Sequence, residues 1–366
     1  MEYQTIVHPT PPPCVHVSGS HREIGRQIGE ACTVQIRHGI ESARGLLDDS
    51  YNELQLTWEA AKIHARKYLP FSQERYPQYV EEMLGIAEGA NVSFDDVAVV
   101  NGMEAVTMDA LHLIKCTSIA VNDLWTADGH VMVAHNEDWV PEDEDDVYLI
   151  HAVPDDEPAF LAMTYGALLA NIGFNEHGVS QCTDSVYATD SRFGIPRVVI
   201  SRAVLAAKSP GDAIRHMLAP HRSAGYNHLL VHDSGEMYNV EVSSRSFAVL
   251  STSDGYLVHT NHYLDPRMQE IEDEPDELID SRVRYFRATN LLKRTPKQSV
   301  KSLQAILTDH LGFPNSICNH AETIITPLDR EKTINSMVMD LTAKVMYLSW
   351  GNPCCNSTHP FYLETG

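Results

Sequence analysis

Apolar residues follow a helical period in the first third of the chain. Five of them recur at intervals of four: Ile24, Ile28, Cys32, Ile36 and Ile40. This spacing places them on one face of an amphipathic helix, so Cys32 is expected to be a core residue. Further helical pattern runs over 54–90, interrupted by Pro70 and Pro77. The first 115 residues are therefore predicted to be mostly helical.

After residue 115 the period changes to two, the alternation that is typical of strands. The predicted strands cover 116–123, 130–136, 159–165, 167–173, 178–184, 226–233, 236–242, 246–252 and 256–260. Helices are predicted over 196–208, 211–218, 278–293 and 298–310, and a last hairpin over 333–350. Turn signals such as Asp254–Gly255 separate many of the strands. Strand runs that alternate with pairs of helices favour antiparallel sheets covered by layers of helices.

The first hairpin allows a prediction of strand register. If Ala127–Gly129 forms a three-residue loop with Gly129 in the left-handed conformation, residues whose numbers add to 256 face each other. Even-numbered residues of both strands then share one face. Four side chains are expected to converge near the strand ends: Cys116, Ser118, Asn136 and Asp138. A two-residue loop would place Asp138 on the opposite face.

Composition narrows the classes of function. The chain has 366 residues, of which 43% are hydrophobic, enough for one large domain or two smaller ones. Its formal net charge of -23 disfavours nucleic acid and anionic membrane surfaces as partners. The sequence contains neither a long apolar run nor a basic segment followed by an apolar one, which predicts a cytoplasmic protein. Its 7 irregularly spaced cysteines are expected to be reduced thiols.

Cys116 has two competing interpretations. A buried, inert thiol is a common fate of a cysteine. A nucleophilic thiol needs a base, and the residues around Cys116 do not form a cysteine-protease signature. Cleavage of the Lys115–Cys116 bond would provide that base. The new α-amino group of Cys116, with a pKa near about 7.7, could accept the proton of its own thiol.

The segment CTSIAV at 116–121, followed by HNED at 135–138, resembles the N-terminal nucleophile hydrolases of the isopenicillin N acyltransferase (acyl-coenzyme A:6-aminopenicillanic acid acyltransferase) family. It is more distantly similar to choloylglycine hydrolases and penicillin V acylases. Other segments resemble the same family in the expected order: GSHREIGRQIGE, NIGFNEHGVS, LVHTNHYL and NSMVMDL. The resemblance therefore covers most of the chain.

This resemblance implies an α+β fold with four αββα layers and two stacked antiparallel sheets. The precursor would cut itself between Lys115 and Cys116. An α chain of residues 1–115 would stay packed on a catalytic β chain of residues 116–366, and together they would form one domain. The mature protein would be a cysteine amidohydrolase or acyltransferase for a small amide or peptide-like conjugate. The acyl group would pass through an intermediate on Cys116 to water or to an amine.

The resemblance also implies roles for individual residues. Asp138, in the family's N-x-D motif, would orient the charged α-amine of Cys116, and Asn136 would brace the same corner. Asn261 would donate a hydrogen bond to the oxyanion of the tetrahedral intermediate. Such an interaction typically lowers the barrier by roughly 3 to 4 kcal/mol.

Further site residues follow from the same resemblance. Arg330, counted back from the last hairpin, falls where the acyltransferase has a site arginine. His135 stands where choloylglycine hydrolases carry an arginine beside the nucleophile, and we assign it, with Asn175, to substrate binding. Lys115 occupies the position before the nucleophile, where relatives often have a small residue. The rate of self-cleavage is therefore an open question, and the second oxyanion donor is left unassigned.

Two other functions stay open from the residues alone. His228 and His232 lie four apart on a predicted strand and so share a face, which could build half of the site of a metal-dependent hydrolase. Chance spacing is the simpler explanation in a chain with 19 histidines. A chain that keeps the fold but is not cleaved would be an inactive binding protein, and Lys115 motivates this alternative.

No cofactor and no metal site is assigned. The acidic stretches at 141–148 and 270–280 are interpreted as solvated loops. Cys354 and Cys355 are interpreted as an exposed tail in preference to a metal-binding or redox-active pair. An acyl-thioester donor and a homo-oligomer remain open as partners. No phosphate-binding glycine loop or basic cluster suits coenzyme A, which favours hydrolysis of a small amide.

Overall fold

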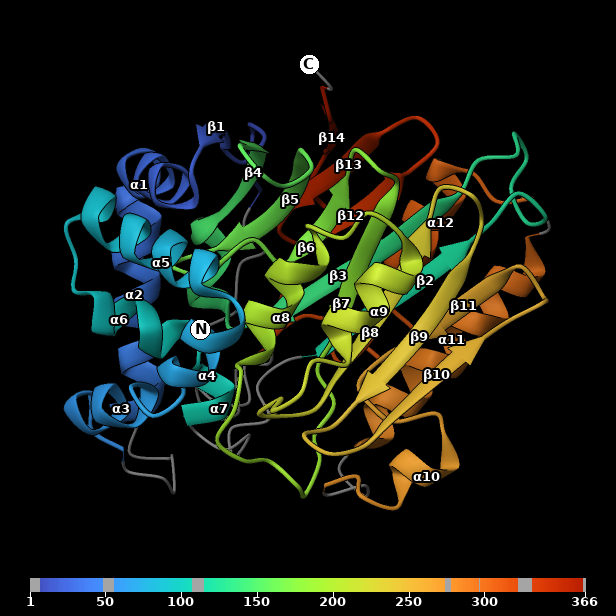
Figure 1. Ribbon diagram of the computed structural model, residues 1–366. Helices are drawn as coiled ribbons and strands as arrows, with labels where there is room; N and C mark the ends of the chain where they lie inside the picture. The colour runs from blue at the N-terminus through green and yellow to red at the C-terminus, as the bar shows by residue number, and fades with distance from the viewer. Residues whose placement is uncertain are drawn as a thin grey trace.

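Two β-sheets packed against each other form the centre of the molecule (Figure 1). The computed structural model describes residues 7–48, 56–106, 115–273, 278–295, 297–321 and 331–364. The larger sheet contains, in spatial order, β1 (Cys14–Gly19), β4 (Val147–Pro154), β5 (Phe160–Tyr165), β6 (Ile172–Asn175), β7 (Val179–Asp184), β8 (Tyr226–His232), β9 (Met237–Val242) and β10 (Phe247–Ser251). The smaller sheet contains β11 (Tyr256–His259), β2 (Lys115–Val121), β3 (Met132–Trp139), β12 (Lys332–Asp340), β13 (Val345–Trp350) and β14 (Thr358–Tyr362). The pairing of β1 with β4 is parallel, and the other pairs are antiparallel.

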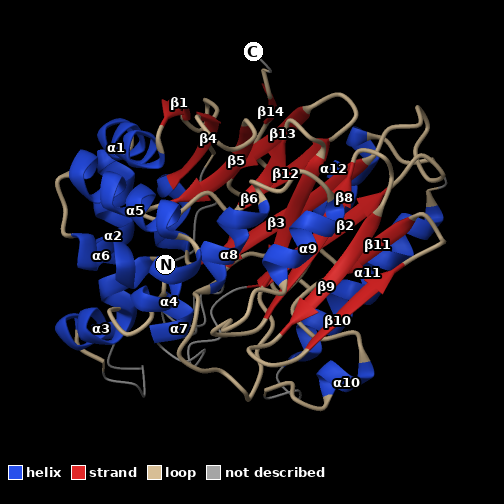
Figure 2. Cartoon of the chain, viewed as in Figure 1, coloured by secondary structure: helices blue, strands red, loops and turns tan. Residues whose placement is uncertain are grey.

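Helices surround the two sheets (Figure 2). The segment before residue 115 supplies α1 (His21–Ala31), α2 (Thr33–Asp48), α3 (Trp58–Ala65), α4 (Leu69–Arg75), α5 (Pro77–Ala90), α6 (Phe94–Val100) and α7 (Met103–Val106). The later helices are α8 (Arg197–Val204), α9 (Pro210–Met217), α10 (Pro266–Gln269), α11 (Ile279–Arg294) and α12 (Val300–Leu307). Among the described residues, no helix is both long and apolar enough to cross a membrane.

Separate apolar clusters show that these elements stack as four layers. Between the sheets, Val133 of β3 belongs to the same buried cluster as Leu161 of β5. On the outer face of the smaller sheet, Ile119 of β2 packs with Leu292 of α11 and with residues of α12. On the outer face of the larger sheet, strands β8 and β9 pack against α8 and α9, and β4 and β5 pack against α1, α2 and α5. The fold is therefore α+β with αββα layers, as predicted.

The apolar stripe predicted over 24–40 is buried, but it does not lie on one helix. Helix α1 ends at Ala31 and α2 begins at Thr33, with Cys32 as the cap residue between them. The Cys32 side chain is 1% exposed, which confirms that it belongs to the core. The prediction of one continuous helix was wrong because a spacing of four residues persists across a break of a single residue.

Three strands were missed in the sequence, and several boundaries were wrong. Strand β4 reads VYLIHAVP without regular alternation, because neighbouring layers cover both of its faces and seven of its eight residues are buried. Strand β1 lies in the segment predicted as helical, and β14 follows the predicted last hairpin. Strand β6 covers Ile172–Asn175 and not 167–173, and α12 ends at Leu307 and not at residue 310.

The acidic segment 141–148 is not a solvated loop. A 3₁₀ helix covers Pro141–Asp146, and three of its acidic side chains are buried. Glu144 forms an ion pair with Lys332, and Asp146 Oδ2 lies 2.7 Å from Nδ1 of His38. These partners come from distant parts of the chain, so the charge run alone could not reveal them. The interpretation as an exposed charge run was therefore wrong here.

Helices α1 and α5 approach each other through glycines. Gly25 of α1 lies so close to α5 that a Cβ atom there would be 2.0 Å from the carbonyl oxygen of Glu82. Gly89 of α5 has the reciprocal arrangement, because a Cβ there would be 2.1 Å from the carbonyl oxygen of Arg26. Backbone atoms cannot move aside as a flexible side chain can. The spacing of the two helices therefore requires residues without a side chain.

We predict that Gly25→Ala destabilises the protein, whereas Gly45→Ala does not. A methyl group at Gly25 collides with the α5 backbone, which should lower the free energy of unfolding by about 1–3 kcal/mol or more. Gly45 is exposed on α2 and has open space around it, so alanine there should stabilise by about 0.5–1 kcal/mol. Urea unfolding of both variants measures the difference. Equal effects of the two substitutions would contradict the close approach of α1 and α5.

Candidate active site

The pairing of β2 with β3 decides which side chains meet Cys116. Cys116 lies opposite Glu137 and not opposite Val140, and Lys115 lies opposite Asp138. An odd shift in register exchanges the two faces of a strand. Four residues consequently share the face between the sheets: Cys116, Ser118, His135 and Glu137. The prediction that Asn136 and Asp138 share this face was wrong.

The connection between β2 and β3 explains the error. Residues 122–131 join the two strands, so the loop is much longer than the three residues predicted. The backbone N–H of Asn122 donates to the carbonyl of Gly255, and the N–H of Ala127 donates to the carbonyl of Gln298. Gly129 does adopt the left-handed conformation, with a φ of 79°, but inside this longer loop. Contacts with distant segments thus set the register.

The thiol of Cys116 is buried beside a carboxylate. Its side chain is 1% exposed, and Sγ donates to Oε2 of Glu137 at 3.5 Å. Burial, reinforced by the charges of Glu137, Asp184 and Asp138, raises the pKa of the Cys116 thiol well above its ordinary value. The thiol is therefore protonated in this state, and its reactivity depends on a group that accepts its proton.

A continuous chain of buried polar groups begins at this thiol. Oε2 of Glu137 lies 2.9 Å from Nε2 of His135. Nδ1 of His135 lies 2.9 Å from Oγ of Ser118, and this hydroxyl donates to Oδ1 of Asp184 at 2.7 Å. The chain crosses from the smaller sheet to β7 of the larger sheet. Its first three groups, from Cys116 to His135, also bring their ligand atoms within 4.8 Å of one another, an arrangement open to a metal ion.

The far end of the chain is a buried ion triad. Nδ1 of His259 lies 3.2 Å from Oδ2 of Asp184, and its Nε2 lies 3.1 Å from Oε1 of Glu241. Burial disfavours the charged imidazole, but the two carboxylates outweigh it and raise the pKa of His259 to about 9. Burial likewise raises the pKa of Asp184, but the hydrogen bond and charge of His259 bring it below its ordinary value. Both partners are therefore charged near neutral pH.

Asp138 lies on the opposite face of β3 and has an unused oxygen. Its Oδ1 accepts a hydrogen bond of 2.6 Å from Oγ1 of Thr333, whereas Oδ2 has no hydrogen-bond partner among the described residues. Burial raises the pKa of Asp138 to about 8, although the charges of Arg284 and Lys115 lower it. Because Asp138 faces Lys115 across the strand pair, it lies next to the bond predicted to be cleaved.

Asn136 binds backbone groups on the outer face of β3, while its predicted role beside the α-amine of Cys116 stays a prediction. Its Nδ2 donates to the carbonyl oxygens of Leu307 and Ile317, at 2.9 and 2.8 Å. These bonds tie β3 to the end of α12 and to the segment after it. Lys115 lies on the same face, with Nζ 3.2 Å from Oε2 of Glu331. The ammonium group therefore has a partner that holds it away from the inter-sheet space.

Arg284 of α11 was missed in the sequence. It is 2% exposed, and its guanidinium donates to the carbonyl oxygen of Cys116, to Oγ1 of Thr117 at 3.0 Å and to Oδ1 of Asn261 at 2.8 Å. The sequence did contain a signal for a buried arginine. Arg284 precedes the buried Ala288 by four positions and so lies on the apolar face of its helix. Arg330, which was predicted as the site arginine, lies outside the described residues.

Asn261 does contact Cys116, but it does so through its amide oxygen and not through its amide nitrogen. Oδ1 accepts the backbone N–H of Cys116 at 2.8 Å as well as the guanidinium of Arg284, and Nδ2 donates to the carbonyl of Ser185 at 3.0 Å. Since Arg284 can only donate, this orientation of the amide is fixed. The structure therefore brings Asn261 to the nucleophile, while its role as an oxyanion donor stays a prediction.

Three other candidate residues are used elsewhere. The Asn175 side chain makes four hydrogen bonds to backbone groups of its own turn and of the α8–α9 connection, so these contacts give it a structural role, and its assignment to substrate binding gains no support from them. His228 contacts Gln181, and His232 contacts Ser234. Neither histidine belongs to a group of three or more close metal-ligand side chains within the described residues. Within the part of the chain that the structure describes, the metal-hydrolase alternative built on these two histidines therefore lacks a ligand group.

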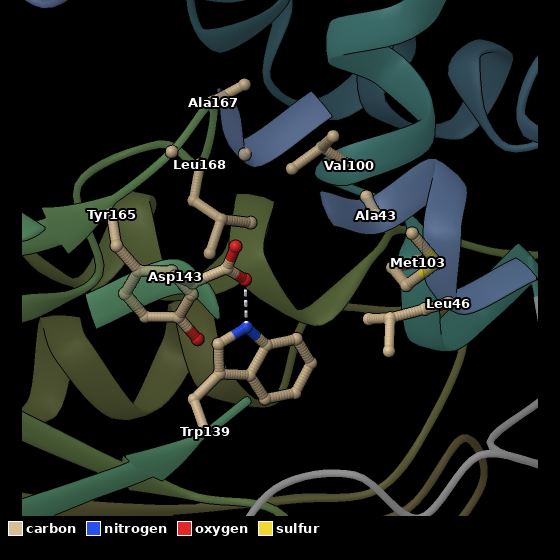
Figure 3. A pocket seen from close by; sticks show the side chains of 11 residues that line it. Ala43, Leu46, Val100, Met103, Trp139, Asp143, Tyr165, Ala167 and Leu168 are labelled. Carbon is tan, nitrogen blue, oxygen red and sulfur yellow. Dashed lines mark hydrogen bonds between the residues drawn. The ribbon is translucent and has the colours of Figure 1, made fainter. Parts of the chain in front are cut away.

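A pocket lies where the segment before residue 115 meets the sheets (Figure 3). Its walls from α2 and from the segment of α6 and α7 are apolar: Ala43, Leu46, Val100 and Met103. Trp139 and Tyr165 form the other side, and the Trp139 ring donates to Asp143. Oη of Tyr165 donates to Oε1 of Glu137 at 3.1 Å. The pocket is thus one hydrogen bond away from the carboxylate that contacts Cys116.

Residues 125–354 match the family model described as "Acyl-coenzyme A:6-aminopenicillanic acid acyl-transferase", and this match covers more than half of the chain. The chain belongs to this acyltransferase family. The matched segment includes the strand with Glu137 and Asp138, together with Asn261 and Arg284. Cys116 lies before it. Membership of the acyltransferase family confirms the resemblance read from the sequence motifs.

Two curated relatives extend over nearly the whole chain. The 40 kDa form of acyl-coenzyme A:6-aminopenicillanic-acid-acyltransferase from Emericella nidulans is 25% identical over 350 residues, 93% of each chain. The β-alanyl-dopamine/carcinine hydrolase of Drosophila melanogaster is 23% identical over 383 aligned positions, 95% of each chain. Among solved structures, a mutant form of conjugated bile acid hydrolase from Clostridium perfringens has a TM-score of 0.46 and 13% identity, with 68% of this chain and 97% of that chain covered.

We predict that the ion triad of this acyltransferase-family protein makes its stability depend on pH. Because the folded-state pKa of His259 is raised from 6.5 to about 9, its stabilising charge is fully present below pH 6.5 and is lost as the pH rises through about 9. His259→Asn should therefore lower the free energy of unfolding more at pH 6 than at pH 9.5. Urea unfolding at both pH values measures this.

His232→Asn is the matched control, because His232 is partly exposed and bonded to a serine hydroxyl. It should change stability little at either pH. A loss for His259→Asn that is the same at pH 6 and pH 9.5 would show that the imidazole is uncharged in the folded protein.

Proposed function

We propose that the protein is a self-cleaving cysteine enzyme that transfers or hydrolyses the acyl group of a small amide, with Cys116 as the nucleophile. The observation that carries this proposal is the environment of Cys116 at the start of β2. Its thiol lies 3.5 Å from a carboxylate, and its backbone nitrogen is held by Asn261. An inert structural cysteine would need neither partner. Membership of the acyltransferase family supports the same reaction class.

Self-cleavage needs a base other than the α-amine, since that amine does not yet exist. Glu137 fits this role, because its Oε2 is the acceptor for the Cys116 thiol. The thiolate attacks the carbonyl carbon of Lys115, the C–N bond breaks, and a thioester forms while the nitrogen of Cys116 takes up a proton. Water then hydrolyses the thioester, which leaves a carboxylate on Lys115 and a free α-amine on Cys116.

Two hydrogen-bond acceptors are available to the new α-amine. Oδ1 of Asn261 already accepts the N–H of Cys116, and Oδ2 of the buried Asp138 has no hydrogen-bond partner among the described residues. An ammonium group can satisfy both acceptors, and its charge would return the pKa of Asp138 toward its ordinary range. In the mature enzyme the amine takes the thiol proton, and Arg284 holds the carbonyl of Cys116 in place.

The substrate we propose is an amide with an apolar acyl group. By their names, one of the two relatives is an acyltransferase and the other a hydrolase, so acyl transfer and hydrolysis both occur among the relatives. The apolar pocket of Figure 3 is the proposed acyl site, because Tyr165 links it to Glu137. Its walls come from both proposed chains, so those chains must stay packed after cleavage. We favour water as the acceptor.

We predict that purified protein runs on a denaturing gel as two fragments, of about one third and two thirds of the chain, with Cys116 at the new N-terminus. Cys116→Ala should remain a single band because it has no nucleophile. Cys182→Ala is the matched control, since Cys182 is also buried between the sheets but its thiol has no hydrogen bond to a carboxylate among the residues that the structure describes. A wild-type band that stays intact and shows no turnover of acyl amides would instead indicate an uncleaved binding protein.

We predict that Glu137→Gln slows self-cleavage by roughly 100-fold or more, because glutamine keeps the acceptor for Tyr165 but cannot take the thiol proton. The first-order rate of fragment formation, followed on gels after refolding, measures this. Asp138→Asn is the comparison, and it should reduce turnover of acyl amides by mature protein more than it slows cleavage. Cleavage of Glu137→Gln at the wild-type rate would remove Glu137 from the mechanism.

A further inference from the structure

Four side chains with metal-binding groups meet at the surface, away from the inter-sheet chain. They are His310, Cys318, His320 and Cys354. Their four ligand atoms all lie within 4.8 Å of one another. The first three come from the segment that follows α12, and Cys354 comes from the turn between β13 and β14. The site therefore joins two segments that are distant in the sequence.

The distances match the edges of a tetrahedron. Zinc bonds of about 2.0–2.1 Å to nitrogen and about 2.3 Å to sulfur place tetrahedral ligand atoms roughly 3.3–3.8 Å apart. Nε2 of His320 lies 3.1 Å from Nε2 of His310, 3.5 Å from Sγ of Cys318 and 3.6 Å from Sγ of Cys354. Two thiols and two imidazoles that converge on one point are thus already close to the spacing of a Cys₂His₂ site.

The ligands are held in this arrangement by the surrounding backbone. The N–H of Cys318 donates to the carbonyl of Asp309 at 3.0 Å, and the N–H of His320 donates to the carbonyl of Pro314 at 3.0 Å. Nδ2 of Asn352 donates to Sγ of Cys318 at 3.5 Å, a type of contact that commonly supports a metal-bound thiolate. Because these hydrogen bonds already fix the loop, its backbone needs little further ordering when an ion binds.

We propose that His310, Cys318, His320 and Cys354 form a structural zinc site. Thiolates select zinc over the hard cations magnesium and calcium, and four protein ligands leave no open position for catalysis. Binding of Zn²⁺ releases the two thiol protons, so the bound site is electrically neutral. Cys354 and His310 are exposed, so the ion can enter from solvent.

The site connects to the active site through Asn319 and Ile317. Asn319 lies between two of the zinc ligands, and its N–H donates to Oγ1 of Thr333 at 2.9 Å. The same hydroxyl donates to Asp138. Ile317, just before the ligand Cys318, accepts a hydrogen bond from Asn136. Zinc binding would therefore stabilise the segment that supports both residues of the N-x-D motif.

Metal content tests the proposal. In a Cys116→Ala background the chain is expected to stay uncleaved, and the group of Cys116, His135 and Glu137 loses its thiol. Failure of the proposed function therefore does not affect the result. Protein expressed with added zinc should contain one zinc per chain by mass spectrometry of the eluted metal. Addition of Cys354→Ser should abolish the zinc. Addition of Cys355→Ser, at the neighbouring exposed thiol outside the ligand group, should leave it in place.

Two further measurements separate a tetrahedral site from loose surface binding. The Co²⁺-substituted protein should show thiolate charge-transfer and tetrahedral d–d bands, and these should vanish in the Cys354→Ser variant. Chelation with EDTA should lower the melting temperature by several degrees in the Cys355→Ser variant and should not change it in the Cys354→Ser variant. Absence of zinc above the buffer background, or zinc retained at one per chain by the Cys354→Ser variant, would overturn the proposal.

Discussion

The register between β2 and β3 is the constraint on which the site depends. Because side chains alternate along a strand, a shift of an odd number of residues would exchange the faces of β3. The observed register places Glu137 opposite Cys116 and leaves Asp138 on the outer face beside Lys115. One carboxylate thereby contacts the thiol, and the other lies on the opposite face of β3, across from Lys115. The proposed chemistry follows from this division of two neighbouring acids between two faces.

The acids between the sheets are stabilised collectively. A buried charge is costly unless it is paired, and the inter-sheet chain pairs its ionisable groups: Glu137 with His135 on the same strand, and Asp184 with His259 on another strand. His259 is charged because Asp184 and Glu241 flank it. Cys116 is the exception, since burial and nearby negative charge keep its proton on sulfur. The network thus holds a reactive group in its unreactive form until a base is engaged.

Much of the architecture could be predicted from the sequence. The change of period near residue 116, the helix pairs and the last hairpin favoured antiparallel sheets covered by helices. The family resemblance implied the αββα layers and the roles of Cys116 and Asn261. The errors have a common origin. Buried β4 does not alternate because both faces are covered, and Glu144 and Asp146 are buried with partners from distant segments, Lys332 and His38. Arg284 was overlooked because it comes from a helix that packs on the site from outside the motifs.

The sequence by itself determined the order of elements, the family motifs and the residue types available for chemistry, because these depend on local spacing. Only the tertiary structure decided which of them meet. The loop at 122–131 set the β2–β3 register through contacts with segments more than 100 residues away, and the same folding brought Cys354 to a group of ligands near residue 318. Periodicity shows that side chains alternate between faces, but packing against distant segments decides which partner each face receives.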